Sequence, residues 1–328
     1  MDRAAIIAFA AAVWGEATKD DVLRRWWLSC EFASTTAAVD RASGRIAGIC
    51  VAVPSQWDLP GHGTAEARSI CGWYVAPEFT GRGLGKVLVR SFAGEASCMN
   101  ALSISEAAIR NFAKLGWVGP FATRLRLLPM PLLARARGRA EGQLEIVSYS
   151  ASSVNFPLGL AAALDRIDAA KPSTQLRRKR RGSDWRAHLA CRPNRRPRFH
   201  ILLCDGEPAG YFIIRSTDRE AGPIYRLARL HYVSDLVVNR LDEELLRFVF
   251  GRIGAVAPAT AGALLFCTSS ATLADAAAQA GWLTENSPFI GPRLAQKAPQ
   301  YMLGEGFVPY AGADFHLTFA DSDVDLNI

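Results

Sequence analysis

A glycine-dense turn between an apolar strand and an apolar helix is the part of this sequence best suited to chemistry. The run Trp73–Lys86 reads WYVAPEFTGRGLGK, with glycines at the alternate positions Gly81, Gly83 and Gly85 and two cations beside them. Glycine has no Cβ, so consecutive backbone N–H groups can approach a ligand, and the start of a helix adds partial positive charge. The pattern predicts the binding of an anion, with a pyrophosphate as the best fit.

Spacing separates three phosphate-binding interpretations of this turn from one another, and a glycine-rich turn without a ligand stays open as an alternative. A Walker A loop requires Ser or Thr after its lysine, but Lys86 is followed by Val87. A dinucleotide fingerprint requires a third glycine two residues beyond Gly85 and an acidic residue about 20 positions later, after a second parallel strand. The first of these patterns is excluded and the second is weak.

The third interpretation is a family resemblance. The stretch resembles the acyl-CoA pyrophosphate loop of the GNAT acetyltransferase superfamily, V-x-P-x-x-(R/Q)-x-x-G-x-(G/A), with Val75, Pro77, Gly83 and Gly85 in register. It departs from that pattern at Thr80, where the family has Arg or Gln. The resemblance implies that this turn binds acetyl-CoA or CoA.

A second resemblance lies in the segment Ala108–Trp117, which is similar to the family's A-x-x-x-Y-x-K-L-G-F. The family's tyrosine lies near the CoA sulfur and often protonates the departing thiolate, but Phe112 stands here and has no proton to donate. The family's asparagine, three residues before the alanine, is Ser105. The resemblance implies the cofactor-binding set Trp73, Tyr74, Val75, Thr80, Gly81, Arg82, Gly83, Leu84, Gly85, Lys86, Ser105 and Phe112.

The catalytic side chains are less well marked than the cofactor loop. In the family, a backbone N–H of the strand before the loop bonds the thioester oxygen, and the base is often a Glu about six residues before Val75. Ser69 occupies that position, which leaves Glu66 as the nearest carboxylate and His62 as another option, both equally consistent with solvated surface. A base acting through water is also possible. We predict Glu66 as the base and Tyr74 as the fallback acid.

The elements that position these residues follow from periodicity and turn residues. The predicted order is helix 2–16, strands 35–39 and 45–53, loop 57–64, strand 68–75, helix 84–96, strand 100–104, helix 105–115 and strand 121–128. This order predicts an α/β fold built on a mixed sheet. The resemblance implies the same arrangement.

The chain of 328 residues is about twice the usual domain length, so two domains are expected. The segment 128–142 combines prolines, glycines and charge, as linkers do. We predict a GNAT-like acyl-CoA-binding domain at 1–130, a linker at 131–142 and a second domain at 143–328.

The second half repeats the first, with the same 27 residues between a strand glycine and a later valine. The corresponding positions are Gly48 and Gly210, Val75 and Val237, and Gly116-Trp117 and Gly281-Trp282. In the second copy, the strand is followed by Asn239–Glu244, which has no glycine and three acidic residues. The prediction is a degenerate GNAT-like domain that has lost its CoA loop.

The net charge of +7 comes from one segment. Residues 171–198 contain eleven Lys or Arg and a single acid, Asp184, so the rest of the chain is acidic. Three interpretations of the run Arg177–Arg181 remain open: a solvated loop, a binder of nucleic acid or an anionic membrane surface, or a subsite for an anionic acyl acceptor.

Composition narrows the remaining possibilities. The chain has no long uncharged apolar run and no signal-peptide pattern at its start, so a cytosolic protein is expected. Seven scattered cysteines and five histidines show no metal-ligand spacing. The predicted function is an acyl-CoA-dependent N-acyltransferase acting on a small or glycan-linked amine. The alternatives are a CoA-binding protein with decayed catalysis and, third, a nucleic-acid binder.

Overall fold

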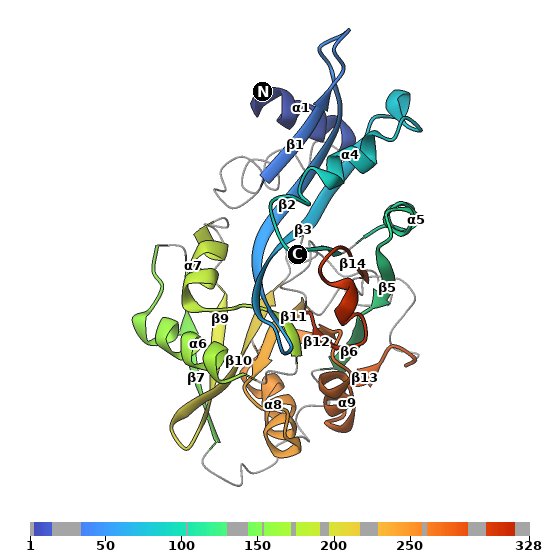
Figure 1. Cartoon of the computed structure of the whole chain (residues 1–328). Helices are drawn as coiled ribbons and strands as arrows, with labels where there is room; N and C mark the ends of the chain where they lie inside the picture. The colour runs from blue at the N-terminus through green and yellow to red at the C-terminus, as the bar shows by residue number, and fades with distance from the viewer. Residues whose placement is uncertain are drawn as a thin grey trace. The chain divides into compact units, whose positions relative to one another are not determined.

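The chain folds into two compact units, which the computed structural model (Figure 1) describes over most of the sequence. The described residues are 3–14, 34–102, 104–129, 144–152, 154–171, 175–190, 197–216, 229–257, 261–287 and 300–318. Unit 1 is built from 1–121 and 300–313, and unit 2 from 122–299 and 314–326.

Unit 1 has a mixed sheet with helices on both faces. Its elements are α1 (Arg3–Trp14), β1 (Ser34–Val39), β2 (Ile46–Leu59), β3 (Gly63–Val75), the short 3₁₀ helix η2 (Pro77–Phe79), α4 (Leu84–Arg90), β4 (Cys98–Leu102), α5 (Glu106–Lys114), β5 (Val118–Ala122), β14 (Gln300–Leu303) and η4 (Val308–Tyr310). Strands β2, β3, β4, β14 and β5 are neighbours in that order, and β1 pairs with β2. Helix α1 packs on one face through Ala10 and Ile49, while α4 and α5 cover the other through Leu88 and Phe112.

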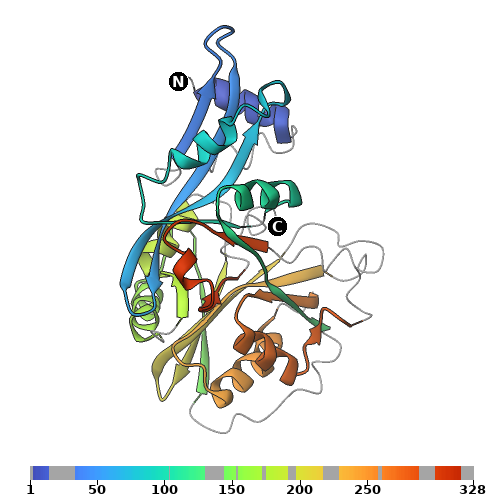
Figure 2. The same cartoon turned by 45° about the vertical axis from the view of Figure 1, so that its right-hand side comes forward.

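The β2–β3 hairpin is longer than the sequence predicted (Figure 2). The two strands pair from Gly48 opposite Val75 to Leu59 opposite Gly63, with one register shift between Val51 and Ala52. The predicted loop 57–64 is therefore wrong, and only 60–62 make the turn. Trp57 explains the difference, because it is fully buried and packs edge-on against Phe307 at 5.3 Å. Its apolar partner lies far away in the sequence, where a local pattern cannot reveal it.

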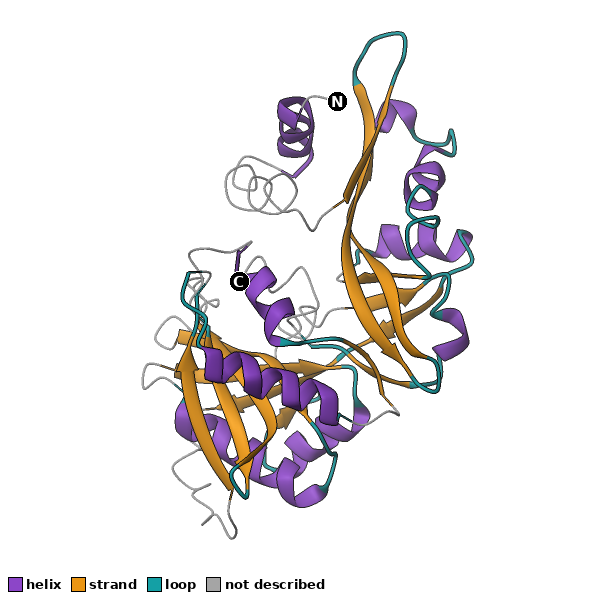
Figure 3. Ribbon diagram, turned by 60° about the vertical axis from the view of Figure 1, so that its left-hand side comes forward, coloured by secondary structure: helices purple, strands orange, loops and turns teal. Residues whose placement is uncertain are grey.

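Unit 2 has a seven-stranded sheet in the order β13-β6-β12-β11-β10-β9-β7. Its elements are β6 (Arg124–Pro129), β7 (Leu144–Ser150), α6 (Leu158–Ala170), β8 (Gln175–Arg178), α7 (Gly182–Ala190), β9 (Arg198–Cys204), β10 (Glu207–Ser216), β11 (Arg229–Val238), α8 (Glu243–Val256), β12 (Ala261–Thr268), α9 (Ala271–Gln279), β13 (Leu283–Thr284) and β15 (Asp314–His316). Helices α8 and α9 cover one face, and α6 and α7 the other (Figure 3). Strands β8 and β15 form a parallel pair.

The two units do not follow the predicted division into 1–130 and 143–328. The predicted strand 121–128 is two strands, of which β5 belongs to unit 1 and β6 to unit 2. Strand β14, from near the end of the chain, pairs with β4 in unit 1. Each sheet is thus completed by a strand from the other half of the chain. The predicted linker 131–142 lies outside the described residues.

The internal repeat is present in the backbone hydrogen bonds as well as in the sequence. Ala76 N–H donates to the Ala47 carbonyl at 2.9 Å, and Asn239 N–H donates to the Ala209 carbonyl at 2.9 Å. Gly48 pairs with Val75, but Gly210 pairs with Val238, one residue later than the predicted partner Val237. The two hairpins therefore differ in length by one residue.

Glycine is required at the same place in both copies. A Cβ on Gly48 would lie 2.9 Å from the Tyr74 carbonyl oxygen, and one on Gly210 would lie 2.6 Å from that of Val237. Both distances are shorter than a carbon–oxygen contact allows, so neither position accepts a side chain without a backbone shift. The helix stops also match, since Gly116 and Gly281 both have positive φ, 85° and 88°.

Candidate functional site

The parallel pair β3–β4 separates halfway along β3. The register runs from Ala67 opposite Cys98 to Ile70 opposite Ala101 and ends there, whereas β3 continues to Val75. No strand in the described ranges pairs with Cys71–Val75 on the side of β4. Strand β3 thus continues beyond the end of its pairing with β4, a geometry that suits an extended ligand that contains amides.

A β-bulge lies where the split begins. Val51 pairs with Gly72 and Ala52 pairs with Ile70, so Cys71 is the extra residue on β3. The bulge places Ile70 and Trp73 on the same face, where both pack into the core beneath α4 and α5. Bulges of this kind interrupt the hydrogen-bond ladder and redirect backbone groups, as a site at this edge requires.

The glycine turn follows directly after the split. Thr80 Oγ1 donates to the Pro77 carbonyl at 2.6 Å, which fastens the start of the turn. Gly81 and Gly83 have φ of 78° and 75°, and a Cβ on either would point into open space. Gly83 is also the N-cap of α4 and makes no side-chain capping bond, so no capping side chain competes with a ligand for the first N–H groups of the helix. The turn has the conformation that anion binding needs.

The third glycine serves a different purpose from the first two. A Cβ on Gly85 would lie 2.9 Å from Cζ2 of Trp73, so Gly85 allows α4 to pack on that indole. Trp73 in turn packs on Phe112, with ring centroids 4.8 Å apart, and Phe112 stacks on Trp117 at 4.4 Å. The buried Nε1–H of Trp73 has no hydrogen-bond partner in the structure. One unused donor therefore lies beside the split.

Two of the predicted cofactor residues, Phe112 and Ser105, have structural roles in unit 1, whereas Arg82 and Lys86 are exposed. Phe112 is 1% exposed and belongs to the core. Ser105 is the N-cap of α5 and accepts from Ala108 N–H at 3.3 Å, as capping serines do. Arg82 is exposed, with its guanidinium 5.4 Å from the centre of the Phe79 ring. Lys86 is exposed at the start of α4.

The structure does not bring the predicted catalytic residues together. Glu66 is exposed in the paired part of β3. Tyr74 is eight residues further along the same strand, about 26 Å at the usual rise per residue. Tyr74 packs edge-on against Phe9 of α1 at 5.9 Å. His62 lies in the hairpin turn beside Tyr310, with ring centroids 5.8 Å apart.

Asn100 is a polar residue of this region that sequence reasoning missed. It is fully buried on β4, and neither its Oδ1 nor its Nδ2 has a hydrogen-bond partner in the described structure. It pairs with Ser69, one residue pair before the split, so the two side chains share a face of the sheet. Buried amides are nearly always hydrogen-bonded. The available signal was one asparagine in the otherwise apolar strand CMNAL.

The basic run Arg177–Arg181 is not the solvated loop that was one of its interpretations. Arg177 and Arg180 are only 2% and 6% exposed. Arg180 Nε lies 2.6 Å from Asp235 Oδ2, and Arg181 Nε lies 3.0 Å from Asp184 Oδ2. Asp235 is too distant in the sequence for a local charge count to include it. That count therefore overstated the solvated positive charge.

Neither a metal centre nor a membrane span is found in the described part of the chain. No group of three or more His, Cys, Asp or Glu side chains there is arranged to hold a metal ion. None of the described helices combines the length and the apolar character that crossing a membrane requires.

Comparison with protein-family profiles finds a match in unit 1. Residues 4–117, about a third of the chain, match the profile of the Acetyltransferase (GNAT) family. No curated protein sequence matches the chain.

Solved GNAT structures extend the likeness in fold beyond those residues. A conserved protein of unknown function from Enterococcus faecalis V583, labelled a probable N-acyltransferase, is 11% identical with a TM-score of 0.60, covering 91% of this chain and 69% of that one. A GCN5-related N-acetyltransferase from Kribbella flavida is 16% identical with a TM-score of 0.55, covering 94% and 71%. Eis1 from Mycobacterium abscessus is 20% identical with a TM-score of 0.51, covering 81% and 64%. Because these structures cover 81% to 94% of this chain, the shared fold includes both units, which agrees with two GNAT-like domains.

Proposed function

We propose that this protein is an acyl-CoA-dependent N-acyltransferase whose unit 1 binds the acyl-CoA, with acetyl-CoA as the expected donor and a small or glycan-linked amine as acceptor. The observation that supports this most strongly is the continuity of the split and the turn. The part of β3 beyond its pairing with β4 leads within a few residues into Gly81 and Gly83. An amide-containing arm and a pyrophosphate are joined in the same order in CoA.

The residues present fit such a ligand. The end of β3 beyond its pairing with β4 lies alongside the proposed arm, and the start of α4, which has no side-chain cap, offers N–H groups to the pyrophosphate. Arg82 and Lys86 are exposed beside the turn and add positive charge. Acyl-CoA supplies an activated thioester. The chain holds that group against a bulged strand, where a backbone N–H stabilises negative charge on the carbonyl oxygen.

Proton transfer at this site receives little help from side chains. Phe112 has no proton to give, so the thiolate leaves unassisted or takes a proton from water. Unassisted departure is feasible because a thiol has a pKa of about 8.5, which makes its thiolate a fair leaving group at neutral pH. General acid catalysis contributes typically about a hundredfold or more, so we expect slow turnover. Ser69 and Asn100 are the nearest polar pair to the start of the split and are candidates to orient the amine.

In unit 2 the strands β11 and β12 also separate, but side chains of unit 2 fill the space beside the split. The pair β11–β12 ends at Val233 opposite Phe266, and a register shift again marks a bulge, at Ser234. Asp235 stands where unit 1 has Gly72, is fully buried, and accepts hydrogen bonds from Tyr211 at 2.7 Å and Thr318 at 2.8 Å. These side chains occupy space that unit 1 leaves to a ligand.

The helix start of unit 2 is also unsuited to a pyrophosphate. Asp242 caps α8 by accepting from Leu245 N–H at 2.8 Å, and Glu243 and Glu244 lie in the first turn. Three carboxylates there repel a phosphate, and the cap already uses one of the N–H groups that would bind it.

One CoA is therefore expected to bind per chain. Isothermal titration of CoA into the full chain is expected to give a stoichiometry near one. Binding should be unchanged in Asp242→Asn, which alters only the unit 2 helix start. Two equal sites, or a marked change of affinity in either direction in Asp242→Asn, would show that CoA binds unit 2 and contradict the proposal.

The second candidate is a CoA-binding protein whose catalysis has decayed. Phe112 and Ser69 replace the family's acid and base, and Glu66 lies far from Tyr74 along β3. Release of free thiol from acetyl-CoA in the presence of a panel of amines decides between the two. Amine-dependent thiol release supports the transferase, while tight CoA binding with no release above the uncatalysed rate supports the binding protein.

A further inference from the structure

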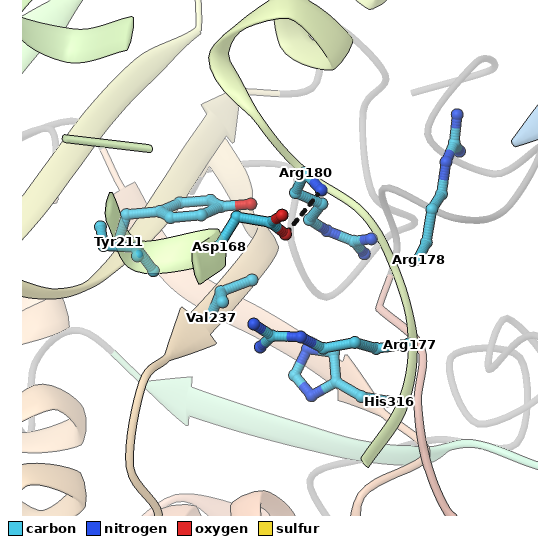
Figure 4. A pocket seen from close by; sticks show the side chains of 8 residues that line it. Asp168, Arg177, Arg178, Arg180, Tyr211, Val237 and His316 are labelled. Carbon is cyan, nitrogen blue, oxygen red and sulfur yellow. Dashed lines mark hydrogen bonds between the residues drawn. The ribbon is translucent and has the colours of Figure 1, made fainter. Parts of the chain in front are cut away.

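Unit 2 contains a buried arginine that the structure leaves without a hydrogen bond. Arg177 is 2% exposed, and its Nε, Nη1 and Nη2 have no partner in the described structure. It is paired in register with His316 across the parallel strands β8 and β15. Figure 4 shows its guanidinium directed into a pocket beside His316 and Val237.

The carboxylates near this pocket contact other basic groups. Asp235 binds Arg180 at 2.6 Å. Asp168 lies 3.1 Å from Lys171 Nζ and 3.8 Å from Lys179 Nζ. Asp168 also accepts from the backbone N–H of Arg180 at 3.2 Å. Neither acid is hydrogen-bonded to the guanidinium of Arg177, although the charges of both act on it.

The ionisation of nearby groups shows the same excess of positive charge. Burial lowers the pKa of Arg177 to about 10, even though the charges of Asp168 and Asp235 oppose that shift. The pKa of Lys171 is lowered to about 6, first by burial and then by Arg177, Lys179, Arg180 and Arg181, despite its contact with Asp168. A buried charge without a partner is strongly unfavourable, so such a group needs a counter-ion.

We propose that the pocket around Arg177 binds a small anionic group, either a carboxylate or a single phosphate. The pocket is lined by Ile167, Asp168, Arg177, Arg178, Arg180, Tyr211, Val237 and His316, all in unit 2. A guanidinium binds either group through two parallel N–H bonds. This inference does not depend on acyl-CoA binding in unit 1.

The dimensions of the pocket select the class of ligand. Its empty space is about 220 Å³ with its open side included, and the gap between the lining atoms has no room for a free water molecule. An entering group must displace a side chain, and Arg178 is the lining arginine that is only half-buried. One carboxylate or phosphate requires the smallest displacement of this kind. A nucleic-acid strand does not, since it needs an exposed basic groove.

The test compares the thermal unfolding of the full chain in chloride, acetate and inorganic phosphate at matched ionic strength. Wild type is expected to gain about 2–4 °C in Tm at tenfold excess over Kd of the anion that fits. Arg177→Met should lose this gain. Arg247→Gln should keep it, because Arg247 is an exposed arginine of α8 paired with Glu243. Whichever of acetate and phosphate gives the gain identifies the group.

Two results would overturn the proposal. One is an equal gain in wild type and Arg177→Met, which would place the anion elsewhere, for example at the glycine turn of unit 1. The other is no gain in wild type with either anion. In chloride alone, Arg177→Met should be at least as stable as wild type, because it removes an uncompensated buried charge. If that variant does not fold, Arg177→Lys replaces it, and a full response in Arg177→Lys would contradict recognition by a guanidinium.

Discussion

Gly83→Glu is expected to weaken CoA binding by at least about a hundredfold, equivalent to ~2.7 kcal/mol. Gly83 has a φ of 75° and is the N-cap of α4, so its neighbouring N–H groups face the proposed pyrophosphate. A glutamate there adds a negative charge, and two like charges about 4 Å apart repel by about 4 kcal/mol at an effective dielectric constant of 20. Isothermal titration with CoA measures the loss.

Gly61→Glu is the matched control for this variant. Gly61 has a φ of 75°, its Cβ would also meet open space, and it lies in the turn between β2 and β3, at the opposite end of β3 from the glycine turn. Both variants suffer the same backbone strain at positive φ, so their unfolding temperatures should fall by similar amounts. Unchanged affinity in Gly83→Glu, or an equal loss of affinity in Gly61→Glu, would show that the turn does not bind CoA.

Arg180→Met is expected to lower the free energy of unfolding by about 3–5 kcal/mol. Arg180 and Asp235 are 6% and 0% exposed and form an ion pair at 2.6 Å. Burial alone would raise the pKa of Asp235, but the charge of Arg180 and the hydrogen bonds from Arg180 and Tyr211 outweigh it and hold the pKa below its ordinary value. Without Arg180, the carboxylate is buried with an insufficient counter-charge. Urea unfolding followed by circular dichroism measures the change.

The double variant Arg180→Met with Asp235→Leu separates an unpaired charge from lost packing. If the single variant is unstable because it strands a carboxylate, removing that carboxylate should recover much of the stability. The single variant should also lose less stability at low pH, where Asp235 can take up a proton. A double variant as unstable as the sum of its parts would assign the effect to packing instead.

The sign of the pH effect follows from the direction of the pKa shift. The pKa of Asp235 is lower in the folded chain than in the unfolded one. Its contribution to stability is therefore fully present above the unfolded value of about 3.9 and is lost as pH falls through the folded value. Wild type should destabilise on acidification through this range, and Arg180→Met should show a weaker dependence.

Local residue patterns predicted several elements of unit 1, although α4 ends at Arg90 and not at the predicted residue 96. The glycine turn lies between β3 and α4, the helix predicted at 105–115 is α5, and the repeat recurs in matching hydrogen bonds of Ala76 and Asn239. Steric rules and hydrophobic periodicity act between near neighbours, so they are legible in a single sequence. The GNAT resemblance rested on the same local spacing.

Tertiary structure decided which distant segments meet. The sequence predicted one strand at 121–128 but held no signal that β6 would pair with β12 while β14 paired with β4. It also marked Arg177–Arg181 as basic without showing that Asp235, more than 50 residues away, would neutralise Arg180 and leave Arg177 unpaired. Strand pairing and buried ion pairs depend on contacts between residues far apart in the chain. The spacing of Gly81, Gly83 and Gly85 by itself predicted where an anion could bind. Only the folded chain shows that Gly85 allows α4 to pack on Trp73, and that β3 continues beyond the end of its pairing with β4.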